Sequence, residues 1–165
     1  MALQRVLDPD RLGDHLDRLY RAAWALSGTR EDAEDLVQET YVRILAKPRL
    51  LRNDDDLGYL LRALRNTFLS QRRRRSPDRS ASTGEDLDQL ADPLAPGPDE
   101  VVEARLVYGV IADLPAEFRD ALVAVDVAGL SYREAARALR VREGTVTSRL
   151  FRARQQVARA LGAEP

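Results

Sequence analysis

The positions of apolar side chains in the first part of the chain predict three helices. In the first, over residues 10–27, one stripe at spacings of three and four contains Leu12, Leu16, Leu19, Tyr20, Ala23 and Leu26. Gly28 is a typical helix stop. Thr29 and Asp32 resemble a capping pair that opens a second helix over residues 30–46.

The third predicted helix starts at Asp55 or Asp56, because a carboxylate suits the N-terminus of a helix. Pro48 closes the preceding helix before that point. The apolar stripe of the third helix contains Leu57, Leu60, Leu61, Leu64 and Phe68. The helix then continues into a block of arginines at residues 72–75.

A segment without helical periodicity divides the chain. Residues 77–98 are rich in proline, glycine, serine and acidic residues, which is typical of a linker. Further helices are predicted over residues 99–113, 115–128, 131–139 and 145–161. We therefore expect an all-α protein with two small helical domains, residues 10–76 and 99–162, joined by a flexible acidic linker.

The net charge of −1 hides a very uneven distribution. Residues 62–79 hold seven arginines and one acid, and residues 131–159 hold eight arginines and two acids. Between these blocks, residues 84–103 hold seven acids and no base. Two basic blocks indicate two contact points on a polyanion, although a solvated arginine-rich surface gives the same pattern.

The stretch LSYREAARALRVREGTVTSRLFRARQQV predicts a helix-turn-helix. Ser131 and Glu134 form a capping box for its first helix, and Ala136 is small enough for two helices to cross closely. Leu139, Val141, Val146 and Leu150 form the expected core. The second helix then presents hydrogen-bonding and cationic side chains for a DNA major groove: Thr145, Thr147, Ser148, Arg149, Phe151, Arg152 and Arg154.

These residues resemble region 4 of extracytoplasmic-function (ECF) sigma factors of the sigma-70 family. The similarity extends back through LPAEFRDALVAVDVAGLS. It implies that Thr147, Ser148, Phe151 and Arg152 read the −35 promoter element. Arg140 replaces the usual turn glycine, so a left-handed turn there is strained. Thr147 stands where a lysine or arginine is common, which leaves the −35 sequence open.

The second predicted helix carries an acidic face that includes the sequence DAEDLVQET. A solvated face is the ordinary interpretation of such a helix. However, the motif resembles sigma region 2.2, which implies a docking surface for the clamp of the largest subunit of core RNA polymerase. The candidate contact residues are Asp35, Leu36, Gln38, Glu39 and Arg43.

The third predicted helix, GYLLRALRNTFLSQRRRR, resembles sigma regions 2.3 and 2.4. Tyr59 replaces a usual tryptophan, and Asn66 stands at a position that helps to hold a flipped base of the −10 element. Together with the loop over residues 52–56, the candidates for the melted −10 strand and its phosphates are Tyr59, Arg62, Arg65, Asn66, Arg72 and Arg73.

The resemblance implies a sigma factor that binds core RNA polymerase and directs promoter-specific initiation. Its expected partners are the polymerase clamp, the flap of the second-largest subunit, promoter DNA and an anti-sigma factor, without a small-molecule substrate or cofactor. The sequence shows no secretory signal and no apolar run of membrane-spanning length, so we expect a cytoplasmic protein that an anti-sigma factor can hold at the membrane.

Three other classes fit the sequence less well. A LuxR-type regulator shares the helix-turn-helix but leaves DAEDLVQET and the arginine-rich helix unexplained. An enzyme is not expected, because the chain has no cysteine, one isolated histidine (His15), no glycine-rich phosphate loop and no metal-ligand cluster. RNA binding through the basic blocks lacks an aromatic platform.

Overall fold

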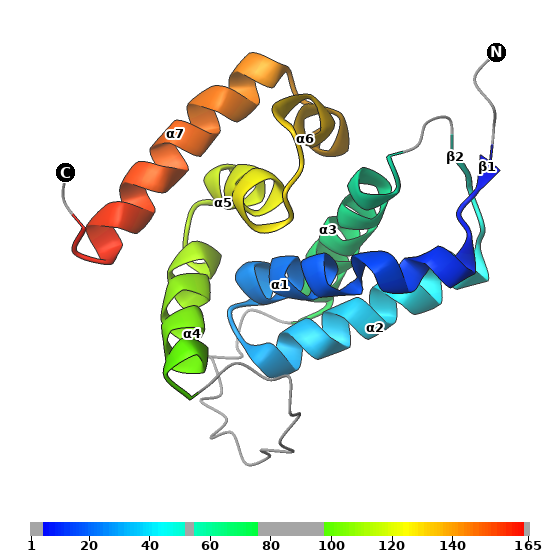
Figure 1. The fold of residues 1–165 in the computed structure, drawn as a ribbon, viewed down its shortest axis with the longest axis horizontal. Helices are drawn as coiled ribbons and strands as arrows, with labels where there is room; N and C mark the ends of the chain where they lie inside the picture. The colour runs from blue at the N-terminus through cyan, green and yellow to red at the C-terminus, as the bar shows by residue number, and fades with distance from the viewer. Residues whose placement is uncertain (1–4, 52–54, 76–97, 164–165) are drawn as a thin grey trace.

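The computed structural model describes residues 5–51, 55–75 and 98–163. These residues are largely α-helical, as the sequence predicts (Figure 1). The predicted linker at residues 77–98 and the loop residues 52–54 lie almost entirely outside this description. The α-helices are α1 (Leu16–Ser27), α2 (Arg30–Ala46), α3 (Asp56–Arg74), α4 (Pro98–Ala112), α5 (Ala116–Leu122), α6 (Tyr132–Leu139) and α7 (Glu143–Ala160).

The predicted capping residues begin and end the helices. Gly28 adopts a left-handed conformation with φ 86° and ends α1, which confirms it as a stop. The hydroxyl of Thr29 accepts a hydrogen bond from the Asp32 amide at 3.2 Å and so caps α2. The carboxylate of Asp55 accepts a bond from the Gly58 amide at 2.8 Å and begins α3. Local sequence therefore determines these three boundaries.

Several short elements differ from the sequence expectation. A 3₁₀ helix, Pro9–His15, precedes α1 in place of a continuous α-helix, because Asp8 caps a tight first turn that has proline at its start. A π-helical turn, Val123–Val127, continues α5. Strands β1 (Arg5–Val6) and β2 (Leu50–Leu51) form a small antiparallel pair, with Arg5 opposite Leu51.

The first residues of α7 were predicted to form a turn. The helix begins at Glu143 instead, and the Arg142 carbonyl accepts hydrogen bonds from the amides of Thr145 and Val146 at 3.0 and 3.2 Å. Gly144 therefore lies in the first helical turn.

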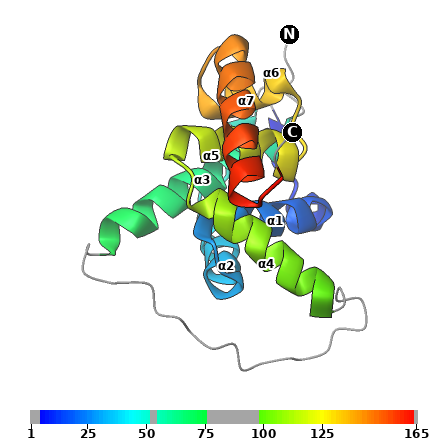
Figure 2. The ribbon, with the colours of Figure 1, turned by 90° about the vertical axis from the view of Figure 1, so that its left-hand side faces the viewer.

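The helices before residue 75, here called the N-terminal part, pack on those after residue 98, the C-terminal part. Helix α1 contacts α4 and the π-helical turn, and α3 contacts α6 (Figures 1 and 2). Fully buried side chains such as Leu19, Leu64 and Val123 belong to one apolar cluster that spans both parts. The sequence pattern predicted two helical units but did not reveal the interface between them.

The described residues lack two kinds of feature. None of their helices is both long enough and apolar enough to cross a membrane. The same residues contain no group of three or more histidine, cysteine, aspartate or glutamate side chains placed to hold a metal ion.

Candidate nucleic-acid interface

Helices α6 and α7 form the predicted helix-turn-helix. The Ser131 hydroxyl accepts from the Glu134 amide at 3.1 Å, and the Glu134 carboxylate accepts from the Ser131 amide at 2.7 Å, so the capping box is confirmed. Arg140 ends α6 with φ 56° and ψ 46°, the left-handed conformation predicted for that turn. Val146 and Leu150 are fully buried between the helices.

The seven −35 candidates on α7 fall into two groups, according to whether their side chains are exposed or contact other parts of the protein. Thr147, Ser148, Phe151 and Arg152 are exposed, and the Phe151 ring is 63% exposed despite its apolar character. Such an exposed aromatic side chain, beside hydroxyl and guanidinium groups, is suited to an interface with DNA. These four exposed side chains are available to a DNA duplex.

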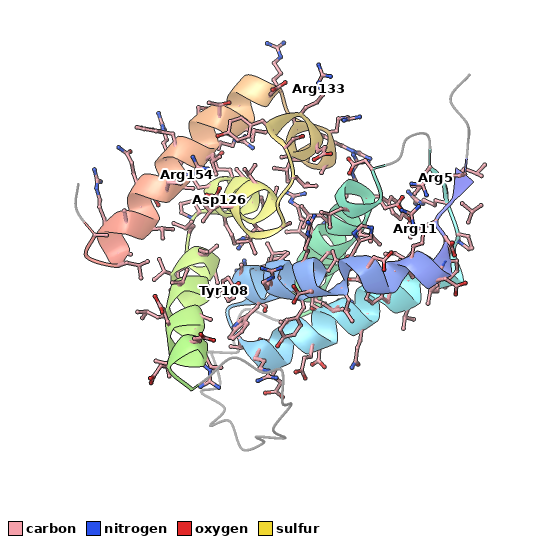
Figure 3. The ribbon with its side chains drawn as sticks, in the orientation of Figure 1. Arg5, Arg11, Tyr108, Asp126, Arg133 and Arg154 are labelled. Carbon is pink, nitrogen blue, oxygen red and sulfur yellow. The ribbon has the colours of Figure 1, made fainter. Side chains whose placement is uncertain are left out.

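The other −35 candidates are engaged within the protein. Thr145 is half-buried, and the half-buried Arg149 forms an ion pair with Glu117 at 3.6 Å. Arg154 donates two hydrogen bonds to the carboxylate of Asp126, at 2.9 and 2.7 Å, and these bonds raise the pKa of its guanidinium (Figure 3). Arg154 is nevertheless 52% exposed, and this pair engages its Nε and one of its two Nη groups.

Helix α2 carries the five candidates for polymerase docking. Asp35, Gln38 and Arg43 are exposed, whereas Leu36 is completely buried and supports the helix from inside. The Glu39 carboxylate accepts hydrogen bonds from Gln71, from Arg74 at 2.7 Å and from Arg43 at 2.6 Å. The bond from Gln71, followed by those from the two arginines, lowers the pKa of Glu39.

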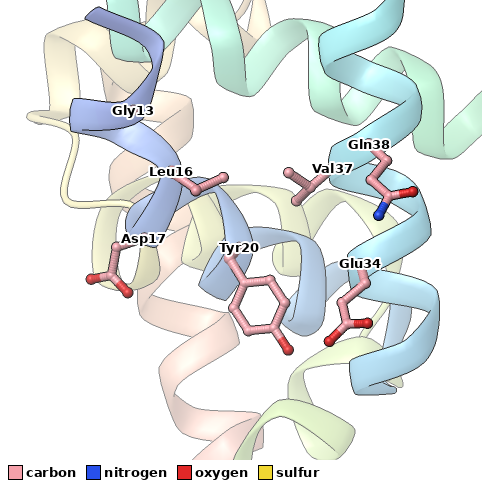
Figure 4. A pocket seen from close by; sticks show the side chains of 7 residues that line it. All are labelled: Gly13, Leu16, Asp17, Tyr20, Glu34, Val37 and Gln38. Carbon is pink, nitrogen blue, oxygen red and sulfur yellow. The ribbon is translucent and has the colours of Figure 1, made fainter. Parts of the chain in front are cut away.

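Two surface grooves flank α2. One, of about 500 Å³, has Leu16, Tyr20 and Val37 on its floor and Asp17 and Glu34 beside them (Figure 4). The other, of about 590 Å³, lies between α2 and the end of α3 and is lined by Asp35, Gln38, Glu39, Val42, Gln71, Arg74 and Arg75. Gln38 lines both grooves, and Asp35 and Glu39 line the second, so these three docking candidates lie on a ridge of α2 beside the grooves.

Helix α3 places its −10 candidates on different surfaces. Asn66, Arg72 and Arg73 are exposed, and Tyr59 is half-buried. Arg62 and Arg65 point toward the C-terminal part. Arg62 donates to the carbonyls of Arg137 and Ala138 at 2.6 and 3.2 Å, and Arg65 contacts Asp120 at 2.5 Å. These two half-buried arginines are therefore partly covered by the other half of the molecule.

The arginine block at the end of α3 is likewise divided. Arg72 lies over the Phe68 ring at 5.6 Å from its centroid. Arg74 pairs with Glu39, and Arg75 reaches Asp32 at 3.4 Å. Arg72 and Arg73 are the phosphate candidates of this block, whereas Arg74 and Arg75 neutralise acidic side chains on α2.

Arg119 and Asp120 form a buried pair that the sequence pattern did not predict. Both side chains are about 95% shielded from solvent, and the Arg119 guanidinium lies 5.0 Å from the Phe68 centroid. Burial lowers the pKa of Arg119, and the Asp120 charge opposes that shift. Adjacent unlike charges on a short helix are typical of a solvated face, so no local signal identified this pair.

Two protein-family models match the chain in the expected order. The model described as Sigma-70 region 2 matches residues 12–77, and the model described as Sigma-70, region 4 matches residues 104–157. The chain is 38% identical over 149 residues to the ECF RNA polymerase sigma factor SigM of Mycobacterium tuberculosis, covering 90% of this chain and 74% of that protein. The chain belongs to the ECF RNA polymerase sigma factor family.

Another ECF RNA polymerase sigma factor, SigE of Mycolicibacterium smegmatis, is 40% identical over 147 residues. That match covers 87% of this chain but 57% of SigE, so the chain spans little more than half of that relative's length. The family assignment confirms the resemblance inferred from both sequence motifs. It gives no support to a LuxR-type regulator.

Two solved structures share the fold. The sigma factor RpoE, in complex with the anti-sigma factor NepR from Bartonella quintana, aligns with a TM-score of 0.73 and 28% identity, over 94% of this chain and 97% of RpoE. CnrH, in complex with the cytosolic domain of CnrY, aligns with a TM-score of 0.65 and 22% identity, over 94% of this chain and 88% of CnrH. The second likeness shows the fold alone. Together with the family models, these structures confirm the all-α, two-region class.

Proposed function

We propose that this ECF sigma factor binds core RNA polymerase and directs promoter-specific initiation of transcription. The observation that carries the proposal is the presence of two matched sigma regions in one chain, each with its own exposed candidate surface. A regulator that only reads duplex DNA has no need of the acidic ridge on α2. As a sigma factor, the chain is a non-catalytic subunit whose effect depends on its partners.

The two regions have different proposed roles. In region 4, Thr147, Ser148, Phe151 and Arg152 enter the major groove of the −35 element, supported by the exposed polar surface of α7. In region 2, Asp35, Gln38 and Glu39 contact the clamp of the polymerase.

Helix α3 then takes the melted −10 strand. Asn66 and Tyr59 hold extruded bases, while Arg72 and Arg73 neutralise phosphates. Arg62 and Arg65 join them once they are released from the C-terminal part. Because opening a duplex costs a few kcal/mol per unstacked step, this surface must provide compensating contacts.

We also propose an anti-sigma factor as a regulatory partner. The solved relative RpoE described above is a sigma factor in a complex of that kind. Exposed apolar side chains on this chain, among them Val42, Leu45 and Leu106, offer contact area to a protein partner. Such a partner keeps the sigma factor away from polymerase in the cytoplasm or at a membrane until a signal releases it.

Transcription from a promoter library in vitro tests the proposed function. Core polymerase is mixed with the purified chain and templates of random upstream sequence, and the transcripts are sequenced. We expect start sites that share a −35 and a −10 element and that disappear when the chain is omitted. Tight duplex binding by the chain alone, with no such transcripts, would refute the proposal.

A substitution tests whether α7 contributes to promoter recognition and not to polymerase binding. Arg152→Ala removes an exposed guanidinium from α7 and should reduce transcription from a selected promoter about tenfold, since one major-groove contact is worth about 1–3 kcal/mol. Binding to core polymerase in the absence of DNA should stay unchanged. An equal loss of core affinity would show that α7 also takes part in docking.

A further inference from the structure

The surface of α3 that faces region 4 includes two of the six residues proposed to bind the −10 strand. Arg62 donates to the last carbonyls of α6, those of Arg137 and Ala138, and the Arg137 carbonyl also accepts from the Arg140 amide at 3.3 Å. A guanidinium at the negative end of a helix is electrostatically favourable. Region 4 therefore binds Arg62 through a feature of its backbone that any sequence of α6 would supply.

Arg65 is held by a side chain. The Asp120 carboxylate on α5 is 5% exposed and accepts from Arg65 at 2.5 Å, while its other oxygen lies 3.4 Å from Arg119. Carboxylates and phosphates are recognised by guanidinium groups in the same way, through charge-assisted hydrogen bonds. Asp120 thus occupies Arg65 as a DNA phosphate would.

Apolar contacts extend this interface on both sides of the ionic pair. The Arg119 guanidinium covers the Phe68 ring of α3 at 5.0 Å, and the Trp24 ring of α1 lies 5.0 Å from that of Tyr108 on α4. At Gly28 the approach is so close that an added Cβ would lie 3.2 Å from the Cβ of Ala112. The two regions therefore form a packed interface that includes the ionic pair between Arg65 and Asp120.

We propose that region 4 is an intramolecular latch over the DNA-facing surface of α3. In the closed state, Asp120 and the end of α6 hold Arg65 and Arg62, so region 2 captures single-stranded DNA only after the two regions separate. The recognition surface of α7 stays exposed throughout. The role assigned to the released arginines rests on the proposed function, whereas the latch itself rests only on the contacts between the regions.

Breaking the ionic pair tests the latch. Asp120→Asn and Arg65→Gln each remove one partner of the pair. Glu34→Gln and Arg30→Gln are the matched controls, because they make the same charge changes in an exposed pair on α2 that measures 3.6 Å. Circular dichroism establishes that each variant is folded. If Asp120→Asn destabilises region 4, Arg65→Gln still tests the latch, because it breaks the same pair without changing the sequence of region 4.

Separation of the regions is measured directly. The chain has no cysteine, so Ala112→Cys introduces a single thiol at the interface, whose rate of labelling by a thiol reagent follows the open population. We expect labelling to accelerate about tenfold in both latch variants, because this partly buried pair contributes more than an exposed one. Trp24, the sole tryptophan, should become easier to quench. Unchanged labelling in both variants would overturn the latch.

A DNA-binding measurement distinguishes a failure of the latch from a failure of the proposed function. A fluorescent single-stranded oligonucleotide of mixed sequence should bind Asp120→Asn about tenfold more tightly than the wild-type chain, with Glu34→Gln as the control for lost negative charge. If labelling accelerates and oligonucleotide affinity stays at the control level, the latch exists but the covered surface is not a DNA site. If neither changes, the latch is refuted whatever the function.

Discussion

Replacing Arg140 by glycine should stabilise the protein by about 0.5–1 kcal/mol. Arg140 adopts φ 56° and ψ 46° at the end of α6, and a left-handed conformation costs an ordinary L-residue about 1–2 kcal/mol. Glycine adopts it without that strain, but the unfolded chain gains flexibility worth about 0.4–1 kcal/mol. The backbone bonds from the Arg140 amide to the carbonyls of Ala136 and Arg137 remain in the variant.

Urea denaturation followed by far-ultraviolet circular dichroism measures this difference. For a chain of this size, 1 kcal/mol corresponds to about 2–4 °C in melting temperature, so thermal melts should show a rise of about 1–4 °C. Arg140→Ala removes the long side chain but keeps a Cβ, so it should stay close to the wild-type stability. That comparison separates relief of backbone strain from loss of a positive charge.

Gly129 provides the converse control. It adopts φ 80°, and a Cβ there would meet no atom within 4 Å, so Gly129→Ala introduces backbone strain without a steric clash. We expect it to lose about 1 kcal/mol. If Arg140→Gly is no more stable than Arg140→Ala while Gly129→Ala loses stability as expected, then the turn at Arg140 is not strained in the way its dihedral angles indicate.

Other substitutions test individual contacts. Ser131→Ala removes half of the capping box and should cost about 1 kcal/mol, measured by urea denaturation. Leu150→Ala leaves a cavity between α6 and α7 and should cost about 2–5 kcal/mol; a smaller loss would mean that the helices close over it. Because Glu39 has a lowered pKa, its stabilisation is present above its ordinary value of 4.5 and is lost as the pH falls further. Melting temperatures measured from about pH 7 to about pH 3 should therefore fall less steeply in Glu39→Gln.

Local chemistry made the helix boundaries predictable. Gly28, Thr29, Asp55 and the Ser131 capping box act within a few residues of their own position, so the sequence was sufficient to place them. The same holds for the exposed surface of α7, because helical spacing decides which side chains face away from Val146 and Leu150.

Contacts across the chain were not predictable in the same way. The motif that suggested Leu36 as a docking residue does not distinguish an exposed position from its buried neighbour on the same helix. The engagement of Arg65 by Asp120 joins residues 55 positions apart, and nothing near either residue marks the other as its partner. Periodicity defines the faces of each helix but does not specify which faces meet.

The position of Glu39 has a thermodynamic consequence for partner binding. Its carboxylate holds Gln71 and Arg74 at the end of α3, so a protein that engages Glu39 competes with these groups and leaves the Arg74 guanidinium unpaired. An anion that draws Arg74 away conversely leaves Glu39 more available. By linkage, each event favours the other by the same factor. In the proposed function, docking on α2 and anion binding on α3 are thereby cooperative, without any change in the fold of either helix.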